Sequence, residues 1–305
     1  MKRKGTPIHG WLVLDKPLGL TSAAAVARVK RLIGAQKAGH AGTLDPLATG
    51  VLPIALGEAT KTVAYAVDGW KTYRFALRWG EARATDDAEG AVVATSDRRP
   101  DADAIRAALP NFIGRIAQRP PAYSAIKLAG QRAYDLARAG AAVAIAPRPV
   151  DIRRLDLIAA ERDRAEFEAE VGAGTYIRSL VRDLGEILQT HAFVTELRRL
   201  AVGRFTLQDA ISLDKLGVLG HSAAASEHLL PIETALDDIP ALALTEDQAK
   251  ALRCGQAVTP LQPQDRARLA QIGDGTTVRA TWGGKLVALA EVAAGGIRPL
   301  RVMNH

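Results

Sequence analysis

The sequence contains only one cysteine, Cys254, among its 305 residues. A single thiol excludes an internal disulfide and any zinc site built from several cysteines. The six histidines show no spacing typical of metal ligands, so we expect no metal site. The segment 57–61, Gly-Glu-Ala-Thr-Lys, lacks the spacing of a phosphate-binding P-loop. We therefore expect neither a disulfide, nor a metal site, nor a P-loop in this protein.

Long apolar runs are also absent. No stretch approaches the roughly 20 apolar residues that a membrane-spanning helix needs. The basic N-terminus is followed by only Gly-Trp-Leu-Val-Leu before Asp15, which is too short for the apolar core of a signal peptide. We therefore expect a protein without membrane association that works in the cytoplasm.

Acidic residues are scarce near the N-terminus. Residues 1–40 hold eight lysines and arginines but only one acid, Asp15, so this segment alone carries the +7 charge of the whole chain. A basic surface suits a polyanionic partner, although a solvated basic face is the plainer interpretation of charge alone. The 48% hydrophobic and 24% charged residues are typical of a globular protein, and the length allows two domains.

Strand and helix periods alternate along the chain. Apolar residues at every second position predict half-buried strands over 72–79 and 166–171. Asp101 to Leu109 is expected to be helical, with Pro110 ending the helix. The stripe of Ile177, Leu180, Val181, Leu184 and Leu188 predicts a second helix, with Thr175 as its N-cap. Residues 85–90 are expected to form a turn between strands.

Asp45 is the most informative residue because it stands alone among small and apolar neighbours. Gly39, Gly42 and Gly50 flank it and permit close approach of the backbone to a ligand. Pro46 directs Asp45 toward an extended or turn conformation. An Asp-Pro pair more often opens an ordinary turn, so spacing alone leaves both interpretations open.

The wider sequence around Asp45 closely resembles the catalytic motif of bacterial tRNA pseudouridine-55 synthases, the TruB-type pseudouridine synthase family. The resemblance extends over most of the chain through segments that occur in the same order as in the family. These segments are 39–61 with Gly-Thr-Leu-Asp-Pro at 42–46, 15–22, 71–75, 118–127 followed by Gly130, Tyr134, Ala137 and Arg138, 174–180, and 197–199. Several matched motifs in order are far more specific than any one of them.

The resemblance implies a role for each matched residue. Asp45 corresponds to the catalytic carboxylate, Arg178 to its counterion, and Tyr73 to a catalytic tyrosine whose ring stacks on uracil and whose phenol can receive the C5 proton. Tyr176 and Leu197 are expected to line the uracil pocket, and His40 to fill the space that the target nucleotide leaves. The reaction is an isomerisation, so no cofactor is expected. Attack at C1′, attack at C6 and a glycal route all remain open.

Other residues are expected to contact RNA. Lys16 and Lys61 belong to the matched motifs, and we interpret them as mainly structural with some attraction for phosphate. The insertion 120–140 carries Lys127, Arg132 and Arg138 interleaved with tyrosines, which suits an element that closes on RNA. An amphipathic segment packed on the body is the alternative for this insertion.

Three competing functions can be weighed against this resemblance. A base-exchanging tRNA transglycosylase typically needs a cysteine-rich zinc site, which one cysteine cannot form. A non-catalytic RNA-binding protein is disfavoured because Asp45, Tyr73 and Arg178 are all present. An archaeal or eukaryotic relative that modifies ribosomal RNA with protein partners remains open. The chain lacks long lysine-rich tails, which favours a stand-alone tRNA enzyme.

The resemblance therefore predicts an α+β protein with the pseudouridine synthase fold. A catalytic domain, residues 1–238, should contain a central mixed, largely antiparallel sheet flanked by helices. A small β-rich domain of the RNA-binding PUA type should follow at 239–305. The expected substrate is the T stem-loop of tRNA, where uridine-55 becomes pseudouridine. We expect a monomer that needs no protein partner.

Overall fold

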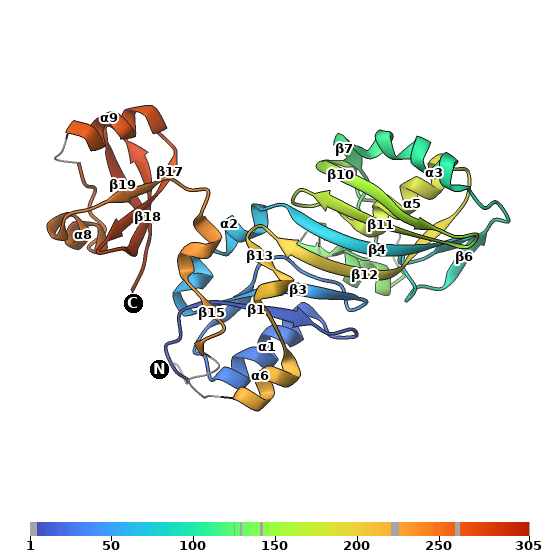
Figure 1. The fold of residues 1–305 in the computed structure, drawn as a ribbon, viewed down its shortest axis with the longest axis horizontal. Helices are drawn as coiled ribbons and strands as arrows, with labels where there is room; N and C mark the ends of the chain where they lie inside the picture. Colours follow the sequence, from blue (N-terminus) through green and yellow to red (C-terminus); the bar gives the residue numbers. More distant parts are fainter. Residues whose placement is uncertain are drawn as a thin grey trace.

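The computed structural model describes residues 5–124, 126–128, 130–140, 143–220, 226–259 and 263–304. Figure 1 shows an elongated molecule in which a large sheet with its helices forms the body and a smaller C-terminal unit lies at one end. Among the described helices, none is long and apolar enough to cross a membrane.

One large sheet forms the body, as predicted, and it is mixed but largely antiparallel. Its main strands follow the order β14-β1-β3-β12-β4-β11-β10-β7, with parallel pairing at β1–β14 and β3–β12. The strands are β1 (Gly10–Lys16), β3 (Ala48–Leu56), β4 (Lys71–Trp79), β7 (Gly114–Gln118), β10 (Arg148–Ala160), β11 (Arg164–Val171), β12 (Ala192–Val202) and β14 (Ala210–Ser212). Three short strands, β2 (Ala38–His40), β13 (Phe205–Thr206) and β15 (Leu229–Leu230), pair with β3, β12 and β1.

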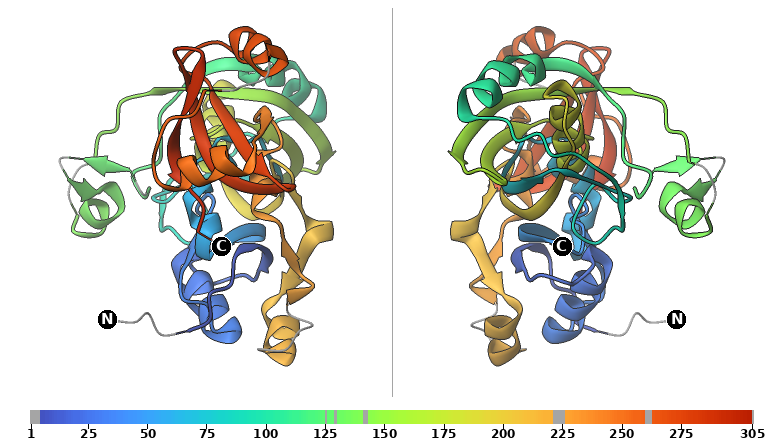
Figure 2. Two further views of the ribbon diagram at one scale, coloured as in Figure 1. Left: turned by 90° about the vertical axis from the view of Figure 1, so that its left-hand side faces the viewer. Right: turned by 90° about the vertical axis from the view of Figure 1, so that its right-hand side faces the viewer.

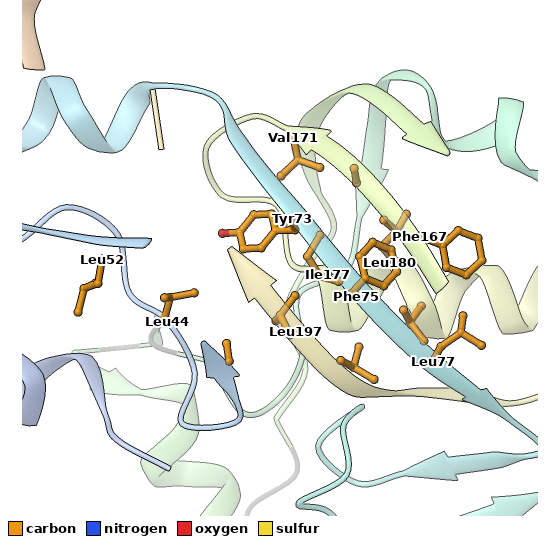
Figure 3. Packing of buried hydrophobic residues seen from close by; sticks show 14 of the residues in the cluster. Leu44, Leu52, Tyr73, Phe75, Leu77, Phe167, Val171, Ile177, Leu180 and Leu197 are labelled. Atoms are coloured by element: carbon orange, nitrogen blue, oxygen red, sulfur yellow. The ribbon is translucent and has the colours of Figure 1, made fainter. Parts of the chain in front are cut away.

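The predicted strands of alternating polarity are confirmed in β4 and β11. Phe75 in β4 stands opposite Phe167 in β11, and their rings stack with centroids 5.4 Å apart (Figure 3). The opposite face carries charged pairs such as Arg74 with Glu166. Period-two alternation places the large apolar side chains on one face, so that face is buried while the ion pairs lie on the other face.

Except for the helix over Ala133–Arg138, which lies on the insertion, the helices pack on the sheet and its edges. They are α1 (Ser22–Ile33), α2 (Val63–Asp68), α3 (Ala102–Ala108), α4 (Ala133–Arg138), α5 (Ile177–Ile187) and α6 (Leu213–Leu219), with short 3-10 turns η1 (Gly57–Lys61), η2 (Leu109–Phe112), η3 (Leu207–Asp209) and η4 (Ile232–Leu236). The predicted apolar stripe of α5 is buried against the sheet. A hairpin of β5 (Glu81–Arg83) and β6 (Val92–Thr95) borders the body.

One local prediction about a helix end is wrong. The N-cap of α5 is Tyr176 rather than Thr175, and its side chain makes no capping hydrogen bond. The Tyr176 amide donates to the Oε1 of Gln118 at 2.8 Å, so a residue distant in sequence holds this junction. The predicted end of the helix over 101–109 is confirmed, because α3 has Asp101 as its N-cap and Leu109 as its C-cap, directly before Pro110, and the 3-10 turn η2 continues from there.

The C-terminal unit has its own four-stranded sheet. Its order is β16 (Ala241–Ala243), β17 (Thr277–Trp282), β18 (Lys285–Ala293) and β19 (Gly296–Val302), with helices α8 (Glu246–Arg253) and α9 (Pro263–Ile272). Leu286, Leu289 and Met303 pack into one cluster with Ile232 and Leu236 of η4. The unit is therefore attached to the body through buried apolar contacts. A division of the chain at residue 238, with a PUA-type module after it, stays a proposal.

Candidate active site

The loop between β2 and β3 holds Asp45 in a fixed position. The Ser22 hydroxyl, at the start of α1, accepts the Leu44 amide at 2.8 Å and donates to the Leu44 carbonyl at 3.0 Å. The Asp45 carbonyl accepts the Ala48 amide at 3.0 Å, which closes the turn after Pro46. The Asp45 side chain keeps 34% of its surface exposed. A rigid backbone thus presents a single carboxylate to incoming molecules.

Arg178, in the first turn of α5, forms the predicted ion pair with Asp45. Its Nε lies 2.9 Å from Asp45 Oδ2, although the N–H is not aligned for a hydrogen bond. The guanidinium is 4% exposed and donates to the carbonyls of Thr85 and Tyr123, each at 2.9 Å. Because the arginine is buried and held from three sides, it fixes the direction of the Asp45 carboxylate.

A second carboxylate, Asp87, lies at this site and was missed by the sequence analysis. It is 3% exposed, and its Oδ2 lies 3.6 Å from the Nε of Arg178. Its Oδ1 accepts the Thr85 hydroxyl at 2.5 Å and the Glu89 amide at 3.0 Å. The turn prediction for 85–90 gave no sign of a buried acid. Only the three-dimensional approach of this loop to α5 reveals its role.

Tyr73 and Leu197 come from neighbouring strands and lie next to the loop. They are 9% and 8% exposed, and the phenol oxygen of Tyr73 points toward the Leu44 side of the site (Figure 3). Arg199 of β12 stands opposite Tyr73 in β4, and Leu197 stands opposite Phe75. Asp45 and Arg178 thus form an ion pair, and Tyr73 and Leu197 lie near Leu44 and Ile177, the chain neighbours of that pair (Figure 3).

Tyr176 and His40 complete this neighbourhood, and both are partly buried. Burial raises the pKa of the Tyr176 phenol above its ordinary value, so the phenol stays protonated at neutral pH. Burial and then the nearby charge of Arg199 lower the pKa of His40, so its imidazole stays neutral. Among the described residues, the Nδ1 of His40 is buried without a hydrogen-bond partner.

The expected phosphate attraction of Lys16 does not fit its position. Lys16 is fully buried and donates from Nζ to the carbonyls of Pro17 and Leu20, at 2.9 and 2.7 Å. Burial lowers its pKa to about 8. Because its amine faces these carbonyls instead of solvent, Lys16 shapes the loop before α1, as the structural part of the prediction stated.

Lys61 likewise serves an internal contact. Its Nζ lies 2.6 Å from Glu58 Oε2 and donates to the carbonyl of Val302 at 2.6 Å. The same Glu58 oxygen accepts the Asn304 amide at 2.7 Å. Lys61 and Glu58 therefore join η1 to the last strand of the C-terminal unit. A contact between Lys61 and RNA has no support from this geometry.

The insertion forms an arm that projects from the body. It contains β8 (Lys127–Leu128), β9 (Gln131–Arg132) and α4, and Figure 2 shows it extending to one side. Lys127 is exposed, and the guanidinium of Arg138 lies 4.4 Å from the ring centroid of Tyr134. The side chain of Arg132 lies outside the part of the chain that the structure describes. Burial, with the nearby charges of Asp87 and Asp45, raises the pKa of Glu89 in the active-site loop, and the charges of Arg178 and Arg138 oppose this rise.

Comparisons with known proteins show which family the chain resembles. A model of the TruB family pseudouridylate synthase N-terminal domain matches residues 30–177, and a model of the tRNA pseudouridylate synthase B C-terminal domain matches residues 178–237. The second range contains β12, so it belongs to the large sheet. The four-stranded sheet follows after both matched ranges.

Full-length relatives and solved structures are similar as well. The tRNA pseudouridine synthase B of Rhodospirillum rubrum is 54% identical over 304 residues, covering 99% of each chain. That of Bradyrhizobium diazoefficiens is 56% identical over 310 residues, covering 100% of this chain and 88% of the relative. A chain of the archaeal box H/ACA sRNP Nop10–Cbf5 complex shares the fold, with a TM-score of 0.73 at 24% identity, over 99% of this chain and 91% of that one.

Proposed function

The chain belongs to the TruB family of pseudouridylate synthases, and from this premise we propose that it isomerises uridine-55 in the T arm of tRNA to pseudouridine. The relatives' shared name, tRNA pseudouridine synthase B, supports tRNA as the substrate. We further propose that the protein acts in the cytoplasm, as a monomer, without an obligate protein partner.

The observation that carries this proposal is the ion pair of Asp45 with the buried Arg178 beside Tyr73. The reaction breaks the bond between ribose C1′ and uracil N1 and joins C1′ to uracil C5. An ionised Asp45 can add to the substrate as a nucleophile or remove a proton as a base. Arg178 directs the Asp45 carboxylate, and its hydrogen bonds to the carbonyls of Thr85 and Tyr123 hold it in place before any substrate arrives.

The remaining residues support binding of the extruded nucleotide. Stacking of uracil on the Tyr73 ring contributes about 1–3 kcal/mol. Leu197 and Tyr176 supply the apolar walls of the pocket, and the neutral His40 can occupy the position that the base leaves. Extrusion of a base costs a few kcal/mol of stacking. The basic arm and the C-terminal unit add contacts to the RNA backbone, which help to offset this cost.

Tritium release tests the proposal directly. Two T-arm stem-loops carry tritium at uracil C5, one only at uridine-55 and one only at another uridine. We expect tritium to reach water from the first and not from the second, with pseudouridine appearing at position 55. Release from the second substrate alone, or from neither, contradicts the proposed function.

A further inference from the structure

Arg199 is a buried cation that the proposed mechanism leaves without a role. It is 1% exposed, and its pattern of contacts differs from that of Arg178. Among the described residues, no carboxylate lies within the 4.0 Å of an ion pair with its guanidinium. A buried charge without an opposite charge destabilises a protein unless hydrogen bonds satisfy it. The hydrogen-bond partners of Arg199 therefore indicate its role.

Its contacts reach three elements of the active site. Nε donates to the carbonyl of Val51 in β3 at 2.8 Å, and the second terminal nitrogen donates to the carbonyl of Gly42 at 3.0 Å. The first terminal nitrogen lies 3.5 Å from the phenol oxygen of Tyr73. Gly42 precedes Asp45 in the same loop. A single guanidinium thus bridges the loop of the carboxylate and the side chain of the tyrosine.

The sheet order explains why this bridge matters. β12 lies between β3 and β4, and Arg199 stands opposite Gly50 on one side and Tyr73 on the other. Asp45 enters the site from the β3 side, whereas Tyr73 enters it from β4. The two groups come from different halves of the sheet, and Arg199 lies where these halves meet.

Glycine at position 50 lets β3 pair closely with the backbone of Arg199. A Cβ on Gly50 would lie 2.2 Å from the Arg199 carbonyl oxygen, so this close approach involves the backbone of Arg199 and not its guanidinium. A Cβ on Gly42 would lie 3.4 Å from the first terminal nitrogen, which is an ordinary van der Waals distance. Both glycines have positive φ values, +99° and +86°, which favour glycine.

The chemistry of the guanidinium fixes the direction of the tyrosine contact. Arginine has five N–H donors and no acceptor, so the phenol oxygen must accept from it. The O–H hydrogen of Tyr73 is then directed away from Arg199. At 3.5 Å this contact is long, so it orients the phenol more than it contributes binding energy.

We propose that Arg199 is a positioning residue that holds the Asp45 loop and the Tyr73 phenol in register across the two halves of the sheet. The inference rests on the proposed function. It assigns no contact between Arg199 and uracil, since the side chain lies beneath the groups that touch the substrate. Loss of the bridge should therefore lower kcat, while the RNA contacts that set KM stay intact.

The test compares Arg199→Lys with wild type, because lysine keeps the charge but a single nitrogen cannot reach all three partners. Arg198→Lys, a partly exposed neighbour on the same strand, is the matched control. We expect Arg199→Lys to fold, to keep KM within about threefold, and to lose about 10- to 100-fold in kcat, as a small misplacement of reacting groups does. Arg199→Met should lose more, so lysine gives partial rescue.

A second readout needs no RNA and no activity. The chain has five tyrosines, so incorporation of 3-fluorotyrosine gives a fluorine spectrum in which Tyr73→Phe identifies one signal. Arg199→Lys should shift the Tyr73 signal and leave the signal of Tyr65, in α2, unchanged. An unmoved Tyr73 signal, or a normal kcat in an active enzyme, overturns the inference. Absence of wild-type activity would instead reject the proposed function. The fluorine spectrum would still test the contact between Arg199 and Tyr73, because it does not depend on activity.

Discussion

Replacement of Arg178 by methionine should destabilise the protein as well as inactivate it. Arg178 is 4% exposed, and it stands between Asp45 and Asp87. Without the guanidinium, the 3% exposed carboxyl group of Asp87 loses its cationic partner, and breaking a buried pair in this way costs about 3–5 kcal/mol. Asp45 contributes little to this cost because its side chain is one-third exposed.

The reasoning predicts a specific rescue. The double variant Arg178→Met/Asp87→Asn lacks the unpaired carboxyl group. Its free energy of unfolding should therefore be at least about 2 kcal/mol higher than that of Arg178→Met alone. Asp45→Asn, as the control partner, should restore less than about 1 kcal/mol in the same background. Urea unfolding at neutral pH measures all variants. Equal rescue by both substitutions, or a cost of Arg178→Met below about 1 kcal/mol, would refute the assignment of Asp87 as the buried partner.

Three further predictions follow from other parts of the structure. Lys61→Met should loosen the attachment of the C-terminal unit, so amide exchange in 286–303 should become faster while kcat on a T-arm stem-loop stays unchanged. Unchanged amide exchange would show that Lys61 does not hold this unit to η1. The pKa of Lys16, lowered to about 8 from 10.5, means that the unfolded chain binds more protons between these values, so stability rises with pH there. Lys16→Met should remove about 1 kcal/mol of this rise between about pH 8 and pH 9.5, whereas the exposed-lysine control Lys30→Met should not. Neutralising Lys127, Arg132 and Arg138 together should flatten the slope of log K against log salt by about two to three units, and an unchanged slope with normal affinity would exclude phosphate contacts by the arm.

Part of the fold and the site could be predicted because the signals are local. The spacing of apolar residues predicted β4, β11 and α5, because side chains repeat every two residues along a strand and every 3.6 residues along a helix. The motif around Asp45 identified the candidate carboxylate, and the resemblance of segment 174–180 to the family identified Arg178 as its counterion. These predictions needed no knowledge of which strands become neighbours.

Other features depend on contacts between distant segments. A buried lysine and an exposed lysine look the same in sequence, so Lys16 and Lys61 were expected to have some attraction for phosphate beside a mainly structural role. The acid in the 85–90 turn becomes a site residue only because its loop meets α5. The hydrogen bonds between Gln118 and the backbone of Tyr176 and the bridge of Arg199 have the same origin. Sheet order and side-chain burial decide these features, and neither is visible in the local pattern.

The central claim is that Asp45 performs the chemistry, and one comparison tests it most directly. Tritium release from a stem-loop labelled at uridine-55 is followed under single-turnover conditions for wild type, Asp45→Asn and Asp103→Asn. Asp103 is a control because its carboxylate is 94% exposed on α3. The account predicts that Asp45→Asn folds and binds the stem-loop but releases no tritium, while Asp103→Asn matches wild type. Turnover of Asp45→Asn within about tenfold of wild type, a loss of less than about 1.4 kcal/mol in barrier height, would contradict it.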